Sequence, residues 1–64
     1  MDKNKHEYNR LLDKQHGYMR KIANGEKLSV DDVVSIERIK TLQEDLLEKI
    51  GSYTPNDIIH GFRE

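Results

Sequence analysis

The chain has 64 residues, of which 34% are hydrophobic and 36% charged, and its formal net charge is −1. A chain this short forms one domain with a thin core, and the complete lack of cysteine excludes disulfides and thiolate metal sites. No apolar run approaches the ~18 residues that a membrane-spanning helix needs, and the polar start differs from a signal peptide. We therefore expect a cytoplasmic protein without membrane association, and the many Lys, Ile and Asn residues beside a single Ala are compatible with a bacterial or phage genome.

The first predicted helix covers residues 3–24. Its apolar stripe recurs at helical spacing on one face and consists of Tyr8, Leu11, Leu12, Gln15, Tyr18, Met19 and Ile22. Asn24 and Gly25 form a left-handed stop. Gly17 lies inside this segment, where a glycine costs up to ~1 kcal/mol relative to alanine. The helix is therefore either continuous or divided into two pieces at Gly17.

The second predicted helix covers residues 30–50 and has the clearest start in the chain. Ser29 is a good N-cap, and Asp32 completes a pair that resembles a capping box. Gly51 ends the helix. The link from the first helix, residues 25–28, is so short that the two helices should be antiparallel neighbours.

The third predicted helix is short and covers residues 55–62. Thr54 is its cap, Pro55 its first residue and Asp57 its third. The predicted fold is thus all-α: one domain over residues 1–64, made of an antiparallel helical hairpin plus a short third helix. The first 25 residues carry six Lys or Arg against three Asp or Glu, and the remainder carry five against nine. We expect these oppositely charged halves to pack on each other.

The apolar face of the second helix is the predicted interface with another chain. On a helical wheel this face sweeps through about 180°, which is more than one antiparallel neighbour covers. We predict a homodimer whose two-fold axis passes near Gln43, with an interface made by Ile36, Ile39, Gln43, Leu46, Leu47 and Ile50. Gln43 and Gln15 then either fix the register of the contact or lie at its edge and reach water.

The apolar residues of the third helix have two alternative uses. If Ile58 is buried, the segment belongs to the fold, and Ile58→Ala costs about 2 kcal/mol or more. If Ile58 is exposed, then Ile58, Ile59 and Phe62 form a secondary docking surface. Tyr53 and Ile58 have the spacing of a hydrophobic staple, which favours the first use.

Catalytic and metal-binding patterns are missing from the sequence. Pairs such as Asp13 with His16 and Asp57 with His60 share a helix face, but neither has the third and fourth ligands that zinc requires. Ser29 and Thr54 are explained as helix caps, and so small a core leaves no room for a substrate pocket. We therefore expect neither enzymatic activity nor a cofactor.

Two functions remain. We expect a protein–protein interaction module: a homo-oligomeric regulator, adaptor or inhibitor of a larger cellular protein. The alternative is a small nucleic-acid-binding accessory protein that uses the basic first helix. Its contacts would be Lys3, Lys5, Arg10, Lys14, Arg20 and Lys21. The second helix begins with two aspartates and carries further acids, which phosphates would repel, so nucleic acid is the less favoured partner.

Overall fold

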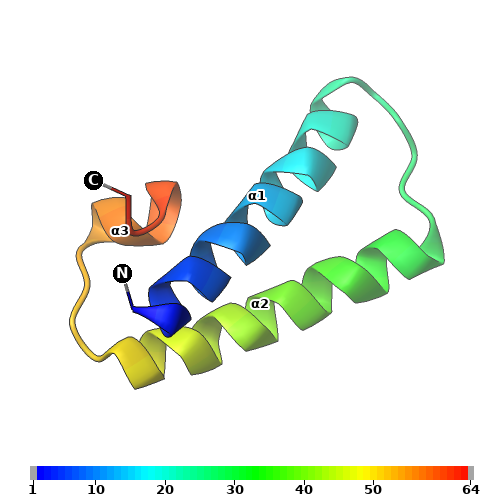
Figure 1. Cartoon of the computed structure of the whole chain (residues 1–64). Coiled ribbons are helices and arrows are strands. Elements are labelled where there is room, and N and C mark those ends of the chain that lie inside the picture. The colour runs from blue at the N-terminus through cyan, green and yellow to red at the C-terminus, as the bar shows by residue number, and fades with distance from the viewer. Residues whose placement is uncertain (1, 64) are drawn as a thin grey trace.

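The computed structural model describes residues 2–63, and these form three helices without a strand (Figure 1). Helix α1 covers Lys3–Ala23, α2 covers Val30–Ile50 and α3 covers Pro55–His60. The prediction of a helical hairpin plus a short third helix is confirmed. α1 is continuous through Gly17, where an added Cβ would meet nothing within 4 Å, so no neighbouring atom requires a glycine there.

Two capping boxes set the starts of α2 and α3, as their sequences predict. The Asp32 N–H donates to the Ser29 hydroxyl oxygen at 3.1 Å, and the Ser29 N–H donates to the Asp32 carboxylate at 3.2 Å. Thr54 and Asp57 make the same reciprocal pair at the start of α3. α3 ends at His60, two residues before the predicted end, because Gly61 leaves the helix with a φ of 87°.

The core lies at one end of the hairpin, where α1 begins and α2 ends. Figure 1 shows the two helices close together there and diverging toward the link formed by residues 24–29. We call these regions the closed end and the open end. The buried apolar residues are Tyr8, Leu11, Leu12, Ile39, Leu46 and Phe62, with Tyr18, Leu47 and Ile50 packed partly against them.

The segment after α3 returns to α1 and closes this core. The Phe62 N–H donates to the Asn9 side-chain oxygen at 2.6 Å, and the Asn9 amide nitrogen donates back to the Phe62 carbonyl at 3.3 Å. The Tyr8 hydroxyl donates to the Ile58 carbonyl at 2.7 Å, and the Tyr8 and Phe62 rings meet edge to face at 5.3 Å. The C-terminal segment is therefore part of the fold.

Candidate interaction surface

Half of the predicted interface on α2 lies inside the chain's own core. Ile39, Gln43 and Leu46 are buried against α1, so they offer no free surface to another copy. The Gln43 side chain is only 8% exposed, and its amide nitrogen donates to the Gln15 side-chain oxygen Oε1 at 3.0 Å. Gln43 therefore does not reach water at an edge, as one of the two expectations had it, and Gln15 is half-buried. Its partner is inside the hairpin.

The other predicted contact residues divide between the border of the core and the surface. Ile36, Leu47 and Ile50 are half-buried. Phe62 is a core residue rather than part of a docking surface, because the tail beyond Gly61 turns it onto Tyr8. Within α3, Ile58 is 39% exposed and Ile59 58% exposed. α3 is therefore held by Phe62 and by hydrogen bonds, and burial of Ile58 contributes less than the staple suggested.

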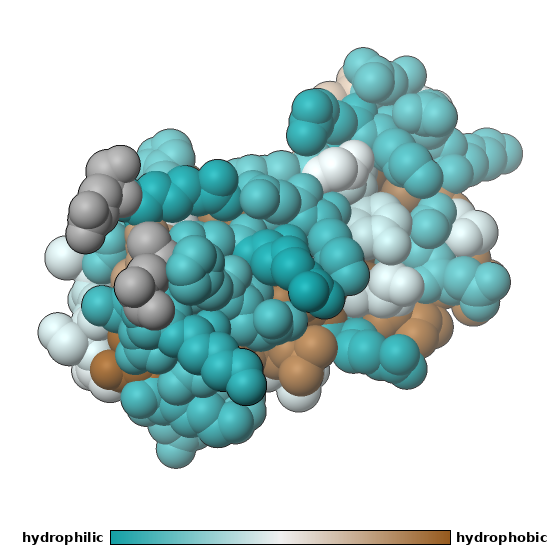
Figure 2. All heavy atoms as spheres, viewed as in Figure 1, coloured by the Kyte–Doolittle hydropathy of each residue, from teal (hydrophilic) through white to brown (hydrophobic). Residues whose placement is uncertain are grey.

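The structure exposes apolar side chains that the sequence did not assign to a surface. Met19 and Ile22, in the last turns of α1, are 53% and 55% exposed although they belong to its apolar stripe. Figure 2 shows brown atoms in the region where α1 ends and α2 begins. Two of the half-buried positions near the start of α2, Asp32 and Ser35, are polar. Leu42, at the edge of the predicted arc, is 44% exposed.

A groove runs between α1 and α2 on one side of the hairpin. Its walls enclose about 220 Å³ and consist of Leu11, Lys14, Tyr18, Ser35, Arg38, Ile39 and Leu42. A second hollow, lined by Lys14, Gly17, Tyr18 and Lys21, continues from it because the two share Lys14 and Tyr18. We refer to both together as the groove. Tyr18 and Leu42 supply its accessible apolar surface, and the buried Leu11 and Ile39 lie beneath them.

The charged residues of the groove are three cations: Lys14, Lys21 and Arg38. Elsewhere the ion pairs found among residues 2–63 join Lys40 to Glu37, Lys49 to Asp45 and Arg63 to Asp13. Within these described residues, no carboxylate lies within 4.0 Å of any of the three groove cations. The Lys21 ammonium lies 5.8 Å from the centroid of the Tyr18 ring, in cation–π geometry.

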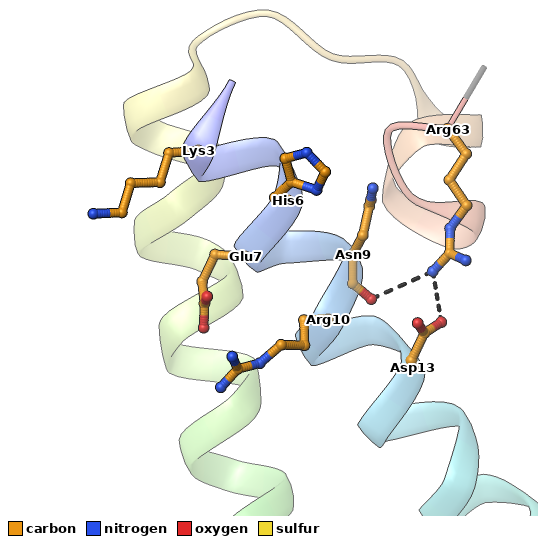
Figure 3. A pocket seen from close by; sticks show the side chains of 7 residues that line it. All are labelled: Lys3, His6, Glu7, Asn9, Arg10, Asp13 and Arg63. Carbon is orange, nitrogen blue, oxygen red and sulfur yellow. Dashed lines mark hydrogen bonds and ion pairs between the residues drawn. The ribbon is translucent and has the colours of Figure 1, made fainter. Parts of the chain in front are cut away.

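A different hollow, of about 460 Å³, lies on α1 beside the C-terminal tail (Figure 3). It is lined by Lys3, His6, Glu7, Asn9, Arg10, Asp13 and Arg63. The Arg63 guanidinium donates to the Asp13 carboxylate and to the Asn9 carbonyl, which ties the tail to α1. Figure 3 shows Lys3, Glu7 and Arg10 pointing away from this contact. Opposite charges alternate around the hollow, and its side chains do not converge on a common point.

The residues predicted to contact nucleic acid do not form one surface. Lys3, Arg10, Lys14 and Lys21 follow a spacing of seven, four and seven residues, which places them on a single exposed face of α1. The Lys5 ammonium instead lies 5.7 Å from the Phe62 ring centroid, and Arg20 lines a separate hollow with His16, Met19 and Ala23. Four of the six predicted contacts therefore share a face.

The titratable hydroxyl of Tyr8 belongs to a buried side chain. It is 1% exposed, and burial disfavours the charged phenolate, which raises the pKa of Tyr8 above its ordinary value of 10.0. Within the same residues, no three His, Asp or Glu side chains are grouped so as to hold a metal ion. No helix in the described part of the chain has the length and apolar character needed to cross a membrane.

Comparison with known proteins gave no match among protein-family models, curated proteins or solved structures. The function is therefore inferred from the surfaces of the chain itself. Two of these surfaces combine exposure with a definite chemistry: the apolar side chains of the open end and the cation-lined groove that extends from it.

Proposed function

We propose that the protein is a non-enzymatic protein–protein interaction module, acting as a regulator, adaptor or inhibitor of a larger cellular protein. The observation that carries this proposal is the imbalance between exposed and buried apolar side chains. Among the described residues, nine large apolar side chains are exposed, whereas six are buried. Scattered apolar residues are ordinary on protein surfaces, but here several are concentrated on the two arms of the open end.

The energetics of this surface favour a protein partner. Met19, Ile22 and Leu42 are each about half exposed. Covering the remainder of such a side chain contributes roughly 1 kcal/mol at about 25 cal/mol per Å². A rigid hairpin loses little conformational entropy on binding, so more of this contribution is retained in the affinity.

The protein partner of this apolar surface can be a second copy of the same chain. The homodimer predicted from the sequence therefore stays a prediction. Its contact would have to use the exposed side chains, such as Leu42 and Ile22, because Ile39, Gln43 and Leu46 are already buried within the hairpin. A small chain without disulfides also gains stability by burying further apolar surface in a dimer.

The test compares two neighbouring substitutions on α2. Leu42→Glu places a charge on an exposed apolar side chain, whereas Thr41→Glu adds the same charge at a position turned by about 100° around the helix. Thr41 is exposed. Circular dichroism and thermal melting verify that both variants fold. Sedimentation velocity then measures self-association, and immobilised protein is used to capture partners from an extract of the cells that make it.

We expect the wild type and Thr41→Glu to self-associate or to capture the same proteins, and Leu42→Glu to lose that interaction. Identical behaviour of all three chains in both assays contradicts the use of this surface. A wild type that stays monomeric and captures nothing contradicts the proposed function as a whole.

A further inference from the structure

The two sides of the hairpin differ in what covers them. The C-terminal tail packs on the side of α1 that carries Asn9 and Asp13. Tyr18 lies nine residues after Asn9, which is half a turn around the helix at about 100° per residue. The groove lined by Leu11, Tyr18 and Leu42 therefore opens on the side of the hairpin that the tail leaves uncovered.

The chemistry of the groove is unusual for this chain. The protein as a whole has a net charge of −1, yet every charged residue that lines the groove is a cation. By contrast, the hollow beside the tail contains Glu7 and Asp13 as well as cations. Lys14, Lys21 and Arg38 surround apolar side chains and find no carboxylate within 4.0 Å among residues 2–63. A ligand that complements this groove has an apolar stripe flanked by negative charge.

We propose that the groove binds an acidic amphipathic helix of a partner protein. This inference rests on the proposed function and adds the chemistry of the partner. From Leu11 to Lys21 the α1 wall of the groove extends about 15 Å, which matches roughly three turns of a helix. Apolar side chains of the partner at i, i+4 and i+7 would contact Tyr18 and Leu42 above the buried Leu11, in the helix-in-groove mode of recognition. Its acidic side chains would pair with Lys14 and Arg38.

The surroundings of the groove favour a peptide over a nucleic acid. Apart from Tyr18, its apolar surface is aliphatic and provides no face on which bases stack. The Lys21 ammonium lies over one face of the Tyr18 ring. α2 also carries Glu37, Glu44 and Glu48 along its exposed face, and these acids repel a phosphate backbone that crosses the hairpin.

The test uses the full chain and a fluorescent helical peptide of about 14 residues, with leucines at i, i+4 and i+7 and glutamates on both flanks. Fluorescence anisotropy compares it with the same peptide carrying lysines in place of the glutamates, with one carrying serines in place of the leucines, and with a DNA duplex. Arg38→Glu removes a cation of the groove. Arg10→Glu makes the same charge change on the exposed face of α1 outside the groove, so it is the matched control.

We expect the acidic amphipathic peptide to bind the wild type, and Arg38→Glu to weaken that binding about tenfold or more. Arg10→Glu should weaken it less than Arg38→Glu does, because Arg10 lines the hollow beside the tail and not the groove. Leu42→Ala should weaken binding about tenfold, as a truncated central contact does. The lysine and serine peptides should bind more weakly than the acidic amphipathic one.

Several results would overturn the inference. In one such result, Arg38→Glu and Arg10→Glu weaken the binding of the acidic peptide equally. In another, the lysine peptide binds the wild type more tightly than the acidic peptide does. If DNA binds more tightly than the acidic peptide and Arg10→Glu abolishes this DNA binding, the exposed face of α1 binds nucleic acid instead. If the acidic peptide fails to bind while Leu42→Glu still abolishes capture of a cellular protein, the partner chemistry is wrong and the proposed function stands.

Discussion

The closed end and the open end of the hairpin use similar residues for different purposes. At the closed end, Tyr8 and Leu12 meet Leu46 and Phe62, and every one of these side chains is buried. At the open end, α1 continues the same apolar stripe, but the helices diverge and Ile22 stays exposed. The comparison indicates that the free energy of folding is concentrated at one end of the molecule. At the other end, the apolar side chains Met19 and Ile22 stay exposed.

The largest effect should come from truncating an apolar side chain at the closed end. Phe62→Ala removes an aromatic ring from the core, along with its edge-to-face contact with Tyr8, and should cost about 3 kcal/mol. Ile22→Ala, the matched truncation at the open end, should change the free energy of unfolding by less than about 0.5 kcal/mol. Urea denaturation followed by circular dichroism measures both. Equal losses would contradict the separation of the two ends.

Substituting alanine for a glycine should have opposite effects on stability at Gly61, beside the closed end, and at Gly17, in the second half of α1. Gly61 adopts a φ of 87°, and an added Cβ would lie 2.5 Å from the Asn9 side-chain oxygen that holds Phe62. Gly61→Ala should therefore cost about 2 kcal/mol. Gly17→Ala meets nothing within 4 Å and should stabilise α1 by about 0.5–1 kcal/mol, as alanine does in a helix interior. Thermal melting of both variants checks the opposite signs, and a gain from Gly61→Ala would show that the tail adjusts freely.

A smaller effect than those of Phe62→Ala and Gly61→Ala concerns the hydroxyl of Tyr8. Tyr8→Phe removes its hydrogen bond to the Ile58 carbonyl and should cost about 1 kcal/mol at pH 7. Because burial raises the pKa of Tyr8, the unfolded chain ionises first, so this contribution is complete below pH 10 and is lost as the pH rises above it. Urea denaturation between pH 7 and pH 11 should show a steeper alkaline loss for the wild type than for Tyr8→Phe. Tyr53→Phe, at an exposed ring, is the control; parallel curves for wild type and Tyr8→Phe would contradict the assignment.

The sequence predicted the local structure better than the surfaces, for a physical reason. In the capping boxes at Ser29 and Thr54, both partners lie three residues apart in the sequence. They therefore set the start of each helix without help from distant parts of the chain. A helical wheel identifies side chains that share a face, but it does not show whether a neighbouring helix reaches them. For that reason the wheel places Gln43 at an interface, whereas the structure buries it inside the hairpin, and the wheel does not reveal that Ile22, on the apolar stripe of α1, stays exposed.

The role of Asn9 had no signal in the sequence. It is a polar residue in a helix interior, and its partner Phe62 is 53 residues away in the chain. Gly61 provides the backbone conformation that brings the two together, but a glycine after a helix is equally typical of a simple helix stop. Only the three-dimensional arrangement reveals that one asparagine holds both the N–H and the carbonyl of the tail residue.

The first turns of α1 and the tail after α3 lie together, as the contact of Lys5 with Phe62 and the pair of Arg63 with Asp13 require. The molecule is 35 Å long, and Figure 1 shows the start of α1 and the segment after α3 away from the link between α1 and α2. If the protein is attached to a solid support near the start of α1 or near the tail, the open end therefore faces the solution in both cases. Kinetic measurements with the protein anchored by one end or by the other should give the same association rate, and a fluorophore on the link would report binding without touching the anchor.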